Sequence, residues 1–184
     1  MKSRRVRKGS KRKSRKLKKS LRNRNRKIYR GGERKEYDNG DVYEGELRVS
    51  KYTNTNEPSG KGKMTYANGD IFEGEWIQGR RGYQGKMTYS NGDIYEGRWY
   101  NNKKQGEGTM IYANGSRYVG NWDDDDKNGQ GTMTYPNGTK FEGEWFDGDE
   151  VNEGTTTYAD GSGARGLYNY GRKDGAFSLS SAPK

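Results

Sequence analysis

The sequence predicts an all-β protein, an elongated single-layer antiparallel sheet of stacked β-hairpin repeats, preceded by a disordered basic N-terminal arm. Three observations predict this fold: a 23-residue repeat between Phe72 and Gly161, a turn dipeptide inside the repeats, and a sharp change of charge near residue 36. A fixed period of this length is typical of a linear array whose units are each too small to bury a core alone. Such an array usually presents a surface and rarely carries out chemistry.

The first half of each repeat has an aromatic residue, a glycine two positions later and a tryptophan four positions later. Four such segments follow one another without a gap, at Phe72–Trp76, Tyr95–Trp99, Tyr118–Trp122 and Phe141–Trp145. Side chains alternate between the two faces of a strand, so these three residues share one face. The glycine leaves a slot for a large ring from a neighbouring strand. We therefore expect an aromatic core along one face of the sheet and charged residues on the other.

The second half of each repeat closes with a short apolar run, a tyrosine and an Asn-Gly pair. Clear examples are Met87–Gly92, Met110–Gly115 and Met133–Gly138. Asn-Gly between two β-rich runs is a strong hairpin signal, because both residues of a two-residue turn need positive φ. One repeat is therefore predicted to be two antiparallel strands, joined by Asn-Gly at one end and by a Gly-rich loop at the other.

The pattern resembles the MORN repeat (membrane occupation and recognition nexus), whose hallmark is Tyr-x-Gly-x-Trp-x-x-Gly at 23-residue spacing. A weaker copy starts at Tyr43, has Leu47 in place of tryptophan, and carries a six-residue insertion within Arg48 to Ser59. A decayed copy starts with Ala164–Tyr168, as expected for a capping unit. The resemblance implies a scaffold or adaptor, often dimeric and sometimes close to membranes.

Charge divides the chain into an arm and a body. Residues 1–35 contain nineteen Lys and Arg and one acid, a net charge of +18, so the remainder carries 11 − 18 = −7. The arm has too few large apolar residues to offset the entropy of ordering, which predicts disorder when it is free. We predict three segments: a disordered polybasic arm at 1–35, a repeat array of about six units at 36–175, and a C-terminal tail at 176–184.

Three functions are open for the arm: nuclear import, nucleic-acid binding without sequence preference, or binding to anionic phospholipid. A solubilising tail is the plain alternative. The cluster of basic residues expected to bind polyanions is Arg4, Arg5, Arg7, Lys8, Lys11, Arg12, Lys13, Arg15, Lys16, Lys18 and Lys19. These functions leave two locations open, the nucleus and the cytoplasmic surface of a membrane. No stretch has the roughly 18 apolar residues of a membrane-spanning helix.

The aromatic face has two roles to weigh. Its rings are first of all the core, but a one-layer sheet offers no second layer to cover them. Either loops and ends of the chain fold over this face, or part of it binds a protein partner or a second copy of the chain. The candidate partner-binding residues are Phe72, Trp76, Tyr95, Trp99, Tyr118, Trp122, Phe141 and Trp145.

Catalytic, cofactor and metal sites are not expected. The chain has no histidine and no cysteine, which removes the commonest general base and the commonest transition-metal ligands. The periodic row Glu73, Glu75, Glu96, Glu142 and Glu144 is interpreted as a solvated strand face rather than a cation site. The acidic run Asp123–Asp126 lacks the spacing of an EF-hand and is interpreted as a solvated loop tip.

The sequence therefore predicts a non-enzymatic scaffold that binds a protein partner through its repeat face, with a polybasic arm for polyanion tethering or nuclear targeting. The alternative is a nucleic-acid-binding protein in which the repeat sheet is only a spacer.

Overall fold

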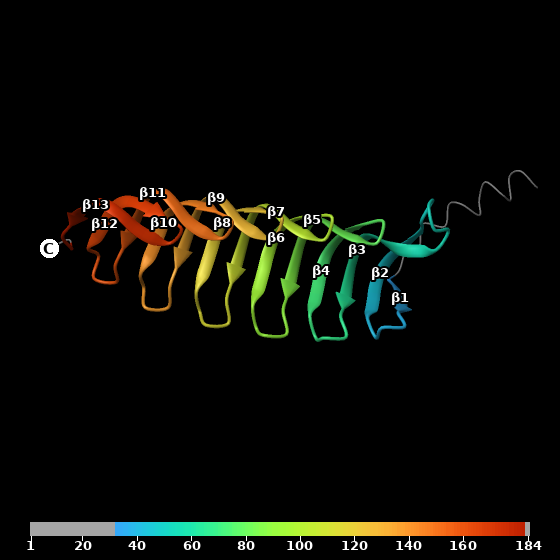
Figure 1. Cartoon of the computed structure of the whole chain (residues 1–184). Helices are drawn as coiled ribbons and strands as arrows, with labels where there is room; N and C mark the ends of the chain where they lie inside the picture. Colours follow the sequence, from blue (N-terminus) through green and yellow to red (C-terminus); the bar gives the residue numbers. More distant parts are fainter. Residues whose placement is uncertain (1–31, 183–184) are drawn as a thin grey trace, which may run out of the picture. The chain divides into compact units, whose positions relative to one another are not determined.

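The computed structural model describes residues 32–182, which form one open antiparallel sheet of thirteen strands in sequence order (Figure 1). This confirms the predicted fold class of stacked β-hairpins. Consecutive strands pair along the whole sheet, as a linear array of hairpins requires. The strands are β1 (Glu33–Glu36), β2 (Val42–Val49), β3 (Asn56–Thr65), β4 (Ile71–Ile77), β5 (Arg80–Thr88), β6 (Ile94–Tyr100), β7 (Lys103–Ile111), β8 (Arg117–Asp123), β9 (Asp126–Thr134), β10 (Lys140–Phe146), β11 (Asp149–Thr157), β12 (Gly163–Asn169) and β13 (Arg172–Ser180).

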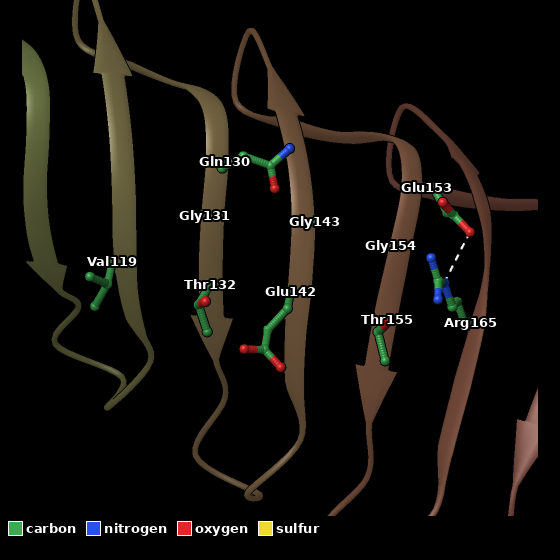
Figure 2. A pocket seen from close by; sticks show the side chains of 10 residues that line it. All are labelled: Val119, Gln130, Gly131, Thr132, Glu142, Gly143, Glu153, Gly154, Thr155 and Arg165. Atoms are coloured by element: carbon green, nitrogen blue, oxygen red, sulfur yellow. Dashed lines mark hydrogen bonds and ion pairs between the residues drawn. The ribbon is translucent and has the colours of Figure 1, made fainter.

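A belt of glycines crosses the sheet from β2 to β12. Each belt glycine is the Cα partner of a glycine on the next strand, and Figure 2 shows Gly131, Gly143 and Gly154 at one level of three neighbouring strands. The belt consists of Gly45, Gly62, Gly74, Gly85, Gly97, Gly108, Gly120, Gly131, Gly143, Gly154 and Gly166. The fixed spacing of glycine within the repeat therefore becomes one continuous line across the strands.

The sheet is bent along this belt. In each of the six hairpins that start with β2, β4, β6, β8, β10 and β12, the register shifts beside the belt, and such bulges bend a strand. Figure 1 shows the consequence: the two halves of each hairpin lie at an angle, so residues 32–182 form a long trough. The aromatic side chains lie inside the trough, and the bend of the sheet itself covers them.

Each leading ring lies over two facing glycines, one on its own strand and one on the next strand. A Cβ built on Gly97 would lie 2.6 Å from the Tyr95 hydroxyl oxygen and 2.5 Å from the Gly108 Cα. A Cβ built on Gly108 would meet the same Tyr95 ring, so one ring covers glycines on two strands. For the glycine between the aromatic residue and the tryptophan, the expectation of a ring from a neighbouring strand was wrong, because the covering ring comes from the same strand. The facing glycine on the next strand is covered by a ring from a neighbouring strand.

The Asn-Gly turns differ from the predicted two-residue turns. In the loop Ala67–Gly69, only Gly69 has positive φ (90°), and Asn68 does not. Tyr66 donates its N–H to the Asp70 carbonyl across a three-residue loop, which is a type I turn followed by a left-handed glycine. Asn68 contributes through its side chain instead, because its Oδ1 accepts the Asp70 N–H at 3.0 Å.

The two-residue turns with two positive φ values occur at the opposite end of the hairpins. Gln78 and Gly79 have φ values of 50° and 79°, which is typical of a type I′ turn. Asn102 and Asp125 occupy the glycine position of this turn in two repeats, with φ values of 73° and 85°. Both residues adopt the left-handed conformation that Asn and Asp tolerate better than most residues.

Both ends of the sheet extend beyond the array expected at 36–175. β1 starts at Glu33 and pairs with β2, and β13 continues to Ser180. The insertion lies in the first repeat as expected, in the loop 50–55 between β2 and β3. The arm was expected to be disordered over residues 1–35, but Glu33–Lys35 belong to β1 because they pair with β2. The basic cluster of the arm, and the rest of the expected disorder, lie in residues 1–31, outside the described residues.

Tyr83 should be strained, because it has a φ of 53° at a bulge where four other repeats have a positive-φ glycine. An L-residue in this conformation costs about 1–2 kcal/mol. Since the Tyr83 side chain is 64% exposed, Tyr83→Gly should raise the free energy of unfolding by about 1 kcal/mol in a urea titration. Tyr100→Gly is the matched control at a 64% exposed position in β6, and it should lower stability. A loss of stability in both variants would contradict the strain.

Candidate functional site: the inner face of the trough

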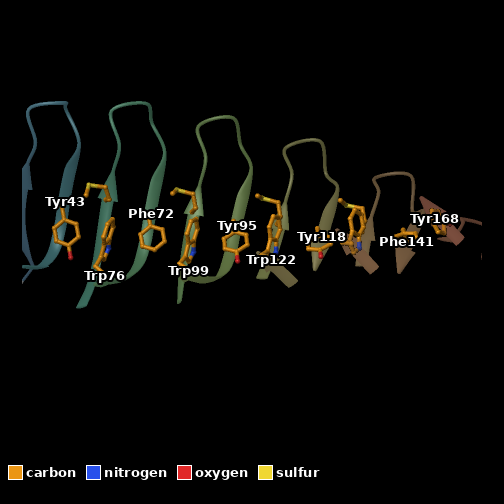
Figure 3. Close-up of a cluster of buried hydrophobic side chains, with 14 of the residues drawn as sticks. Tyr43, Phe72, Trp76, Tyr95, Trp99, Tyr118, Trp122, Phe141 and Tyr168 are labelled. Atoms are coloured by element: carbon orange, nitrogen blue, oxygen red, sulfur yellow. The ribbon is translucent and has the colours of Figure 1, made fainter. Parts of the chain in front are cut away.

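Eleven aromatic rings form an unbroken edge-to-face ladder inside the trough, and Figure 3 shows most of them in line. Within a repeat the ring of Tyr95 lies 5.1 Å from that of Trp99, and between repeats it lies 5.3 Å from Trp122. Perpendicular ring pairs at such distances are favourable beyond the area that they bury. The ladder is Tyr43, Trp76, Phe72, Trp99, Tyr95, Trp122, Tyr118, Trp145, Phe141, Tyr168 and Phe177.

The eight predicted partner-binding side chains all belong to this ladder, and all are buried. Their exposed fractions run from 0% for Phe72, Tyr95 and Tyr118 to 4% for Trp76 and Trp122. The sheet brings the eight residues together, as expected, but leaves almost none of their surface accessible. A partner that approaches this face would therefore contact the side chains that cover the ladder.

Two parallel rows of side chains cover the ladder, and we call them together the inner strip. The first row holds the tyrosines two residues before the Asn-Gly pairs and, in the last unit, before Asp160-Gly161. All are half-buried or little more exposed. The second row holds the residues fifteen positions after these tyrosines, each in the following repeat. The inner strip consists of Tyr66, Tyr89, Tyr112, Tyr135 and Tyr158 in the first row and Arg81, Lys104, Lys127, Glu150 and Lys173 in the second.

Three cations of the charged row lie over tryptophan rings. The Arg81 guanidinium carbon lies 4.4 Å from the ring centroid of Trp99. In the next two repeats Lys104 Nζ lies 4.3 Å from the ring of Trp122, and Lys127 Nζ lies 3.8 Å from that of Trp145. Cation–π contacts of this kind stabilise by about 0.5–1 kcal/mol at exposed sites and by more when they are desolvated.

The two rows meet across the mouth of the trough. Lys173 Nζ donates a hydrogen bond of 2.7 Å to the Tyr158 hydroxyl. One repeat earlier, the Tyr135 hydroxyl donates to Glu150 Oε1 at 3.4 Å. In these two repeats the phenols and the charged groups therefore form one surface.

Partial burial changes the ionisation of the inner strip. Burial lowers the pKa values of Lys104 and Lys127, although nearby aspartates oppose the effect. Burial also raises the pKa of Glu150, and it raises the pKa of Tyr89 to about 12. These groups are the ones that an oppositely charged or hydrogen-bonding partner would contact.

The phenols should make the protein sensitive to alkali. The pKa of Tyr89 is raised above its unfolded value of about 10, so its contribution to stability is fully present below pH 10 and is lost as the pH rises through about 12. The free energy of unfolding, measured in urea at pH 8, 10 and 11, should therefore fall above pH 10. Tyr89→Phe should reduce this fall, and an identical pH dependence in the variant would contradict the assignment.

The outer face carries the glutamate row as exposed and half-buried side chains. Lys86 on β5 is the Cα partner of Glu73 on β4 and of Glu96 on β6, so opposite charges alternate across the strands. Near the C-terminal end, Arg165 and Glu153 form an ion pair of 2.9 Å beside a shallow depression over the glycine belt (Figure 2). Among residues 32–182, no group of three or more Asp or Glu side chains is placed to hold a metal ion. The solvated-face interpretation fits this arrangement.

The acidic run after Trp122 is exposed at the turn between β8 and β9, and its carboxylates also bind the preceding repeat. Asp124 forms an ion pair of 2.8 Å with Lys103, and Asp125 Oδ1 accepts the Lys104 N–H at 2.9 Å. Asp123 Oδ1 accepts a hydrogen bond of 2.7 Å from the Gln105 side chain. These carboxylates link one repeat to the preceding one.

The sheet is thus a hairpin array that buries its own aromatic face. The family model of the MORN repeat matches five consecutive segments, residues 56–71, 72–94, 95–117, 118–140 and 141–163. These segments cover more than half of the sequence, and the chain belongs to the MORN repeat family. β1 and β2 before the matched residues, and β13 with all of β12 except Gly163 after them, continue the same sheet.

Several solved structures are similar to the chain, whereas among curated proteins none matches it. The SAS-4 (dCPAP) TCP domain of Drosophila melanogaster, in complex with a proline-rich motif of Ana2 (dSTIL), is 18% identical, with 82% of this chain and 83% of that chain covered and a TM-score of 0.48. A mutant TCP10 domain of Danio rerio CPAP is 12% identical, with 74% and 72% covered and a TM-score of 0.34.

The sequence reasoning missed the inner strip. Its signal was present, because Arg81, Lys104 and Lys127 recur at the repeat period, as do the tyrosines before each Asn-Gly pair. The bend of the sheet was needed to bring the two rows together, since they lie at opposite ends of each hairpin.

No helix among the described residues is long and apolar enough to cross a membrane.

Proposed function

We propose that this chain is a non-enzymatic scaffold that binds a protein partner along the inner strip. The observation that carries the proposal is a pattern that recurs in five successive units: a tyrosine followed fifteen residues later by a charged side chain. The two side chains are in contact in the last two units. Tyrosine and arginine are enriched at protein interfaces, and half-buried rings offer contact area at little cost in side-chain entropy. The ladder beneath holds this surface rigid, so little ordering is needed on binding.

The test compares charge reversals on the two faces of the full-length protein. Lys104→Glu with Lys127→Glu changes the inner strip, and Lys61→Glu with Lys86→Glu makes the same change of net charge on the outer face. The fold tolerates glutamate at the first two positions, because Glu150 occupies the equivalent position two and one repeats later.

Partner proteins captured by the unchanged chain should be lost with the inner-strip variant and kept with the outer-face variant. Circular dichroism should show that both variants keep the sheet. Loss with the outer-face variant alone would place binding on the other face and contradict the proposal.

A second role is proposed for the arm, on composition alone: residues 1–31 tether the scaffold to a polyanion or direct it to the nucleus. The contribution of +17 from this segment supports charge-driven binding without sequence preference (17 basic residues, no acid). The proposal competes with the reading in which nucleic-acid binding is the main function and the sheet is a spacer.

Salt distinguishes charge-driven tethering from specific recognition. The affinity of the full-length protein for duplex DNA or for anionic vesicles should fall linearly with salt concentration on logarithmic axes, because each contact with a phosphate releases a counterion. Replacing the arginines of the arm by lysine should change the affinity little, since no bidentate geometry is being recognised. Binding that is insensitive to salt, or that strongly prefers one DNA sequence, would contradict this prediction.

A further inference from the structure

The spacing of the inner strip points to the conformation of its ligand, provided that the strip is the binding surface proposed above. Each repeat contributes two strands, and strands lie about 4.8 Å apart, so equivalent side chains recur about every 9.6 Å along the sheet. A ligand that runs along the trough therefore meets a tyrosine and a charged group at about this interval. A regular partner must repeat its own contacts with nearly the same rise.

A polyproline II helix has the matching repeat. It rises about 3.1 Å per residue with three residues per turn, so every third residue returns to the same face after about 9.3 Å. The mismatch is about 0.3 Å per repeat, or about 1 Å over three repeats.

The other regular conformations fit less well. Residues three apart on an extended β-strand point to opposite faces, so they cannot all meet one row. In an α-helix, seven residues rise about 10.5 Å, a mismatch of about 0.9 Å per repeat. The tyrosine row also favours polyproline II, because proline-rich segments in this conformation dock onto aromatic-lined grooves.

The charged row predicts the side chains of the ligand. Arg81, Lys104 and Lys127 occupy three successive repeats, and Glu150 reverses the sign in the fourth. The three cations lie against tryptophan rings and belong to half-buried residues, and Arg81 Nη2 also donates a hydrogen bond of 2.6 Å to the Asn102 carbonyl. Carboxylates three residues apart on one face of a polyproline II helix would pair with them, and a basic residue at the next third position would pair with Glu150.

We propose that the inner strip binds an acidic, proline-rich segment in the polyproline II conformation, with a carboxylate at every third residue facing Arg81, Lys104 and Lys127. A second face of the ligand packs its prolines on Tyr89, Tyr112 and their equivalents, and the third face is open to solvent. The residue of the ligand that faces Glu150 is basic, whereas those that face the three cations are acidic. This difference fixes the direction in which the ligand runs along the array.

The test uses labelled peptides and the full-length protein, with affinity measured by fluorescence anisotropy at fixed salt. The matching peptide has three Pro-Pro-Glu units followed by Pro-Pro-Lys. A spacing control keeps three glutamates and one lysine but separates them by three prolines, and a conformation control replaces the prolines by alanine. The basic arm attracts acidic peptides of any spacing, so the ratio between the matching and spacing peptides reports on the inner strip.

The matching peptide should bind at least about tenfold more tightly than either control, a difference of about 1.4 kcal/mol. Lys104→Glu with Lys127→Glu should abolish this preference, whereas Lys61→Glu with Lys86→Glu on the outer face should leave it intact. Glu150→Lys should weaken the matching peptide and strengthen a peptide of four Pro-Pro-Glu units.

Equal affinity for the matching and spacing peptides would overturn the inference, as would a preference that survives the inner-strip substitutions. Tighter binding of the alanine peptide would assign the trough to a helical ligand and would also overturn it. The proposed function is still supported after any of these results if the inner-strip variant no longer captures natural partner proteins. If that variant still captures them, the proposed function itself is contradicted.

Discussion

Gly97→Val should destabilise the sheet by about 3 kcal/mol or more, the upper range for overpacking a core. A Cβ at this position would lie 2.5 Å from the Gly108 Cα, 2.6 Å from the Tyr95 hydroxyl oxygen and 2.8 Å from the Glu107 carbonyl oxygen. Two of these three neighbours are backbone atoms, so the clash cannot be relieved by a change of rotamer. The free energy of unfolding in urea, compared with that of the unchanged chain, measures the effect.

Glu96→Val is the matched control, because it introduces the same side chain one residue earlier on the exposed outer face. Its effect should stay within about 0.5 kcal/mol, as for most surface substitutions. Strand propensity alone predicts that valine stabilises both positions. An unchanged or raised urea midpoint for Gly97→Val would therefore contradict the packing of rings over the glycine belt.

Trp99→Ala should cost about 3–5 kcal/mol, as is usual for removal of a buried tryptophan. Trp99 is 3% exposed and joins two repeats, because its ring contacts Phe72 on β4 and Tyr95 on β6. It also donates its indole N–H to the Gly85 carbonyl at 3.1 Å and lies beneath the Arg81 guanidinium. Since each repeat contacts mainly its neighbours, the broken ladder should also make unfolding less cooperative.

Tyr100→Ala removes the adjacent aromatic ring, which is 64% exposed, and should change stability much less. Calorimetry of the two variants checks the contrast: Trp99→Ala should lower and broaden the transition, and Tyr100→Ala should shift it little. Similar shifts in both variants would show that the ladder does not couple the repeats.

The hairpin array was predictable because its signals are local and periodic. The aromatic residue, the glycine and the tryptophan recur in register, and alternation along a strand places them on one face. The same reasoning placed the insertion in the first repeat and assigned Ala164–Tyr168 to a final hairpin, which β12 and β13 form. Because the same residue pattern occurs in several repeats, each copy supports the same assignment. A single hairpin would give only one instance of the pattern.

The turn types and the bend were not predictable from the same signals. Asn-Gly fits a two-residue turn and a three-residue loop with glycine alike, and the Tyr66 to Asp70 hydrogen bond decides for the second. The bend depends on a bulge beside each belt glycine, which composition does not reveal. The sequence-based expectation did not include the bend. Part of the aromatic face that contains Trp76 and its equivalents was therefore considered accessible to a partner, whereas the sheet buries these side chains.

Without the bend, the sequence analysis also did not identify the inner strip as the candidate binding surface. Tyr158 and Lys173 lie fifteen residues apart, at opposite ends of their hairpins, and only the bend brings them within 2.7 Å of each other. Strand alternation predicts which residues share a face, but it does not predict which residues meet across a folded sheet. The candidate partner-binding residues are therefore the tyrosines and cations that cover the tryptophans, and not the tryptophans themselves.

Site-specific photo-crosslinking tests the central claim most directly. A photoreactive phenylalanine analogue is placed at Tyr112 on the inner strip and, in a second protein, at Glu96 on the outer face of the same repeat. Both full-length proteins are irradiated with natural partner proteins present, and the crosslinked products are identified by mass spectrometry. Crosslinks to a partner from the Tyr112 position and not from the Glu96 position are the result that we predict. Crosslinks from Glu96 with none from Tyr112 would contradict binding along the inner strip.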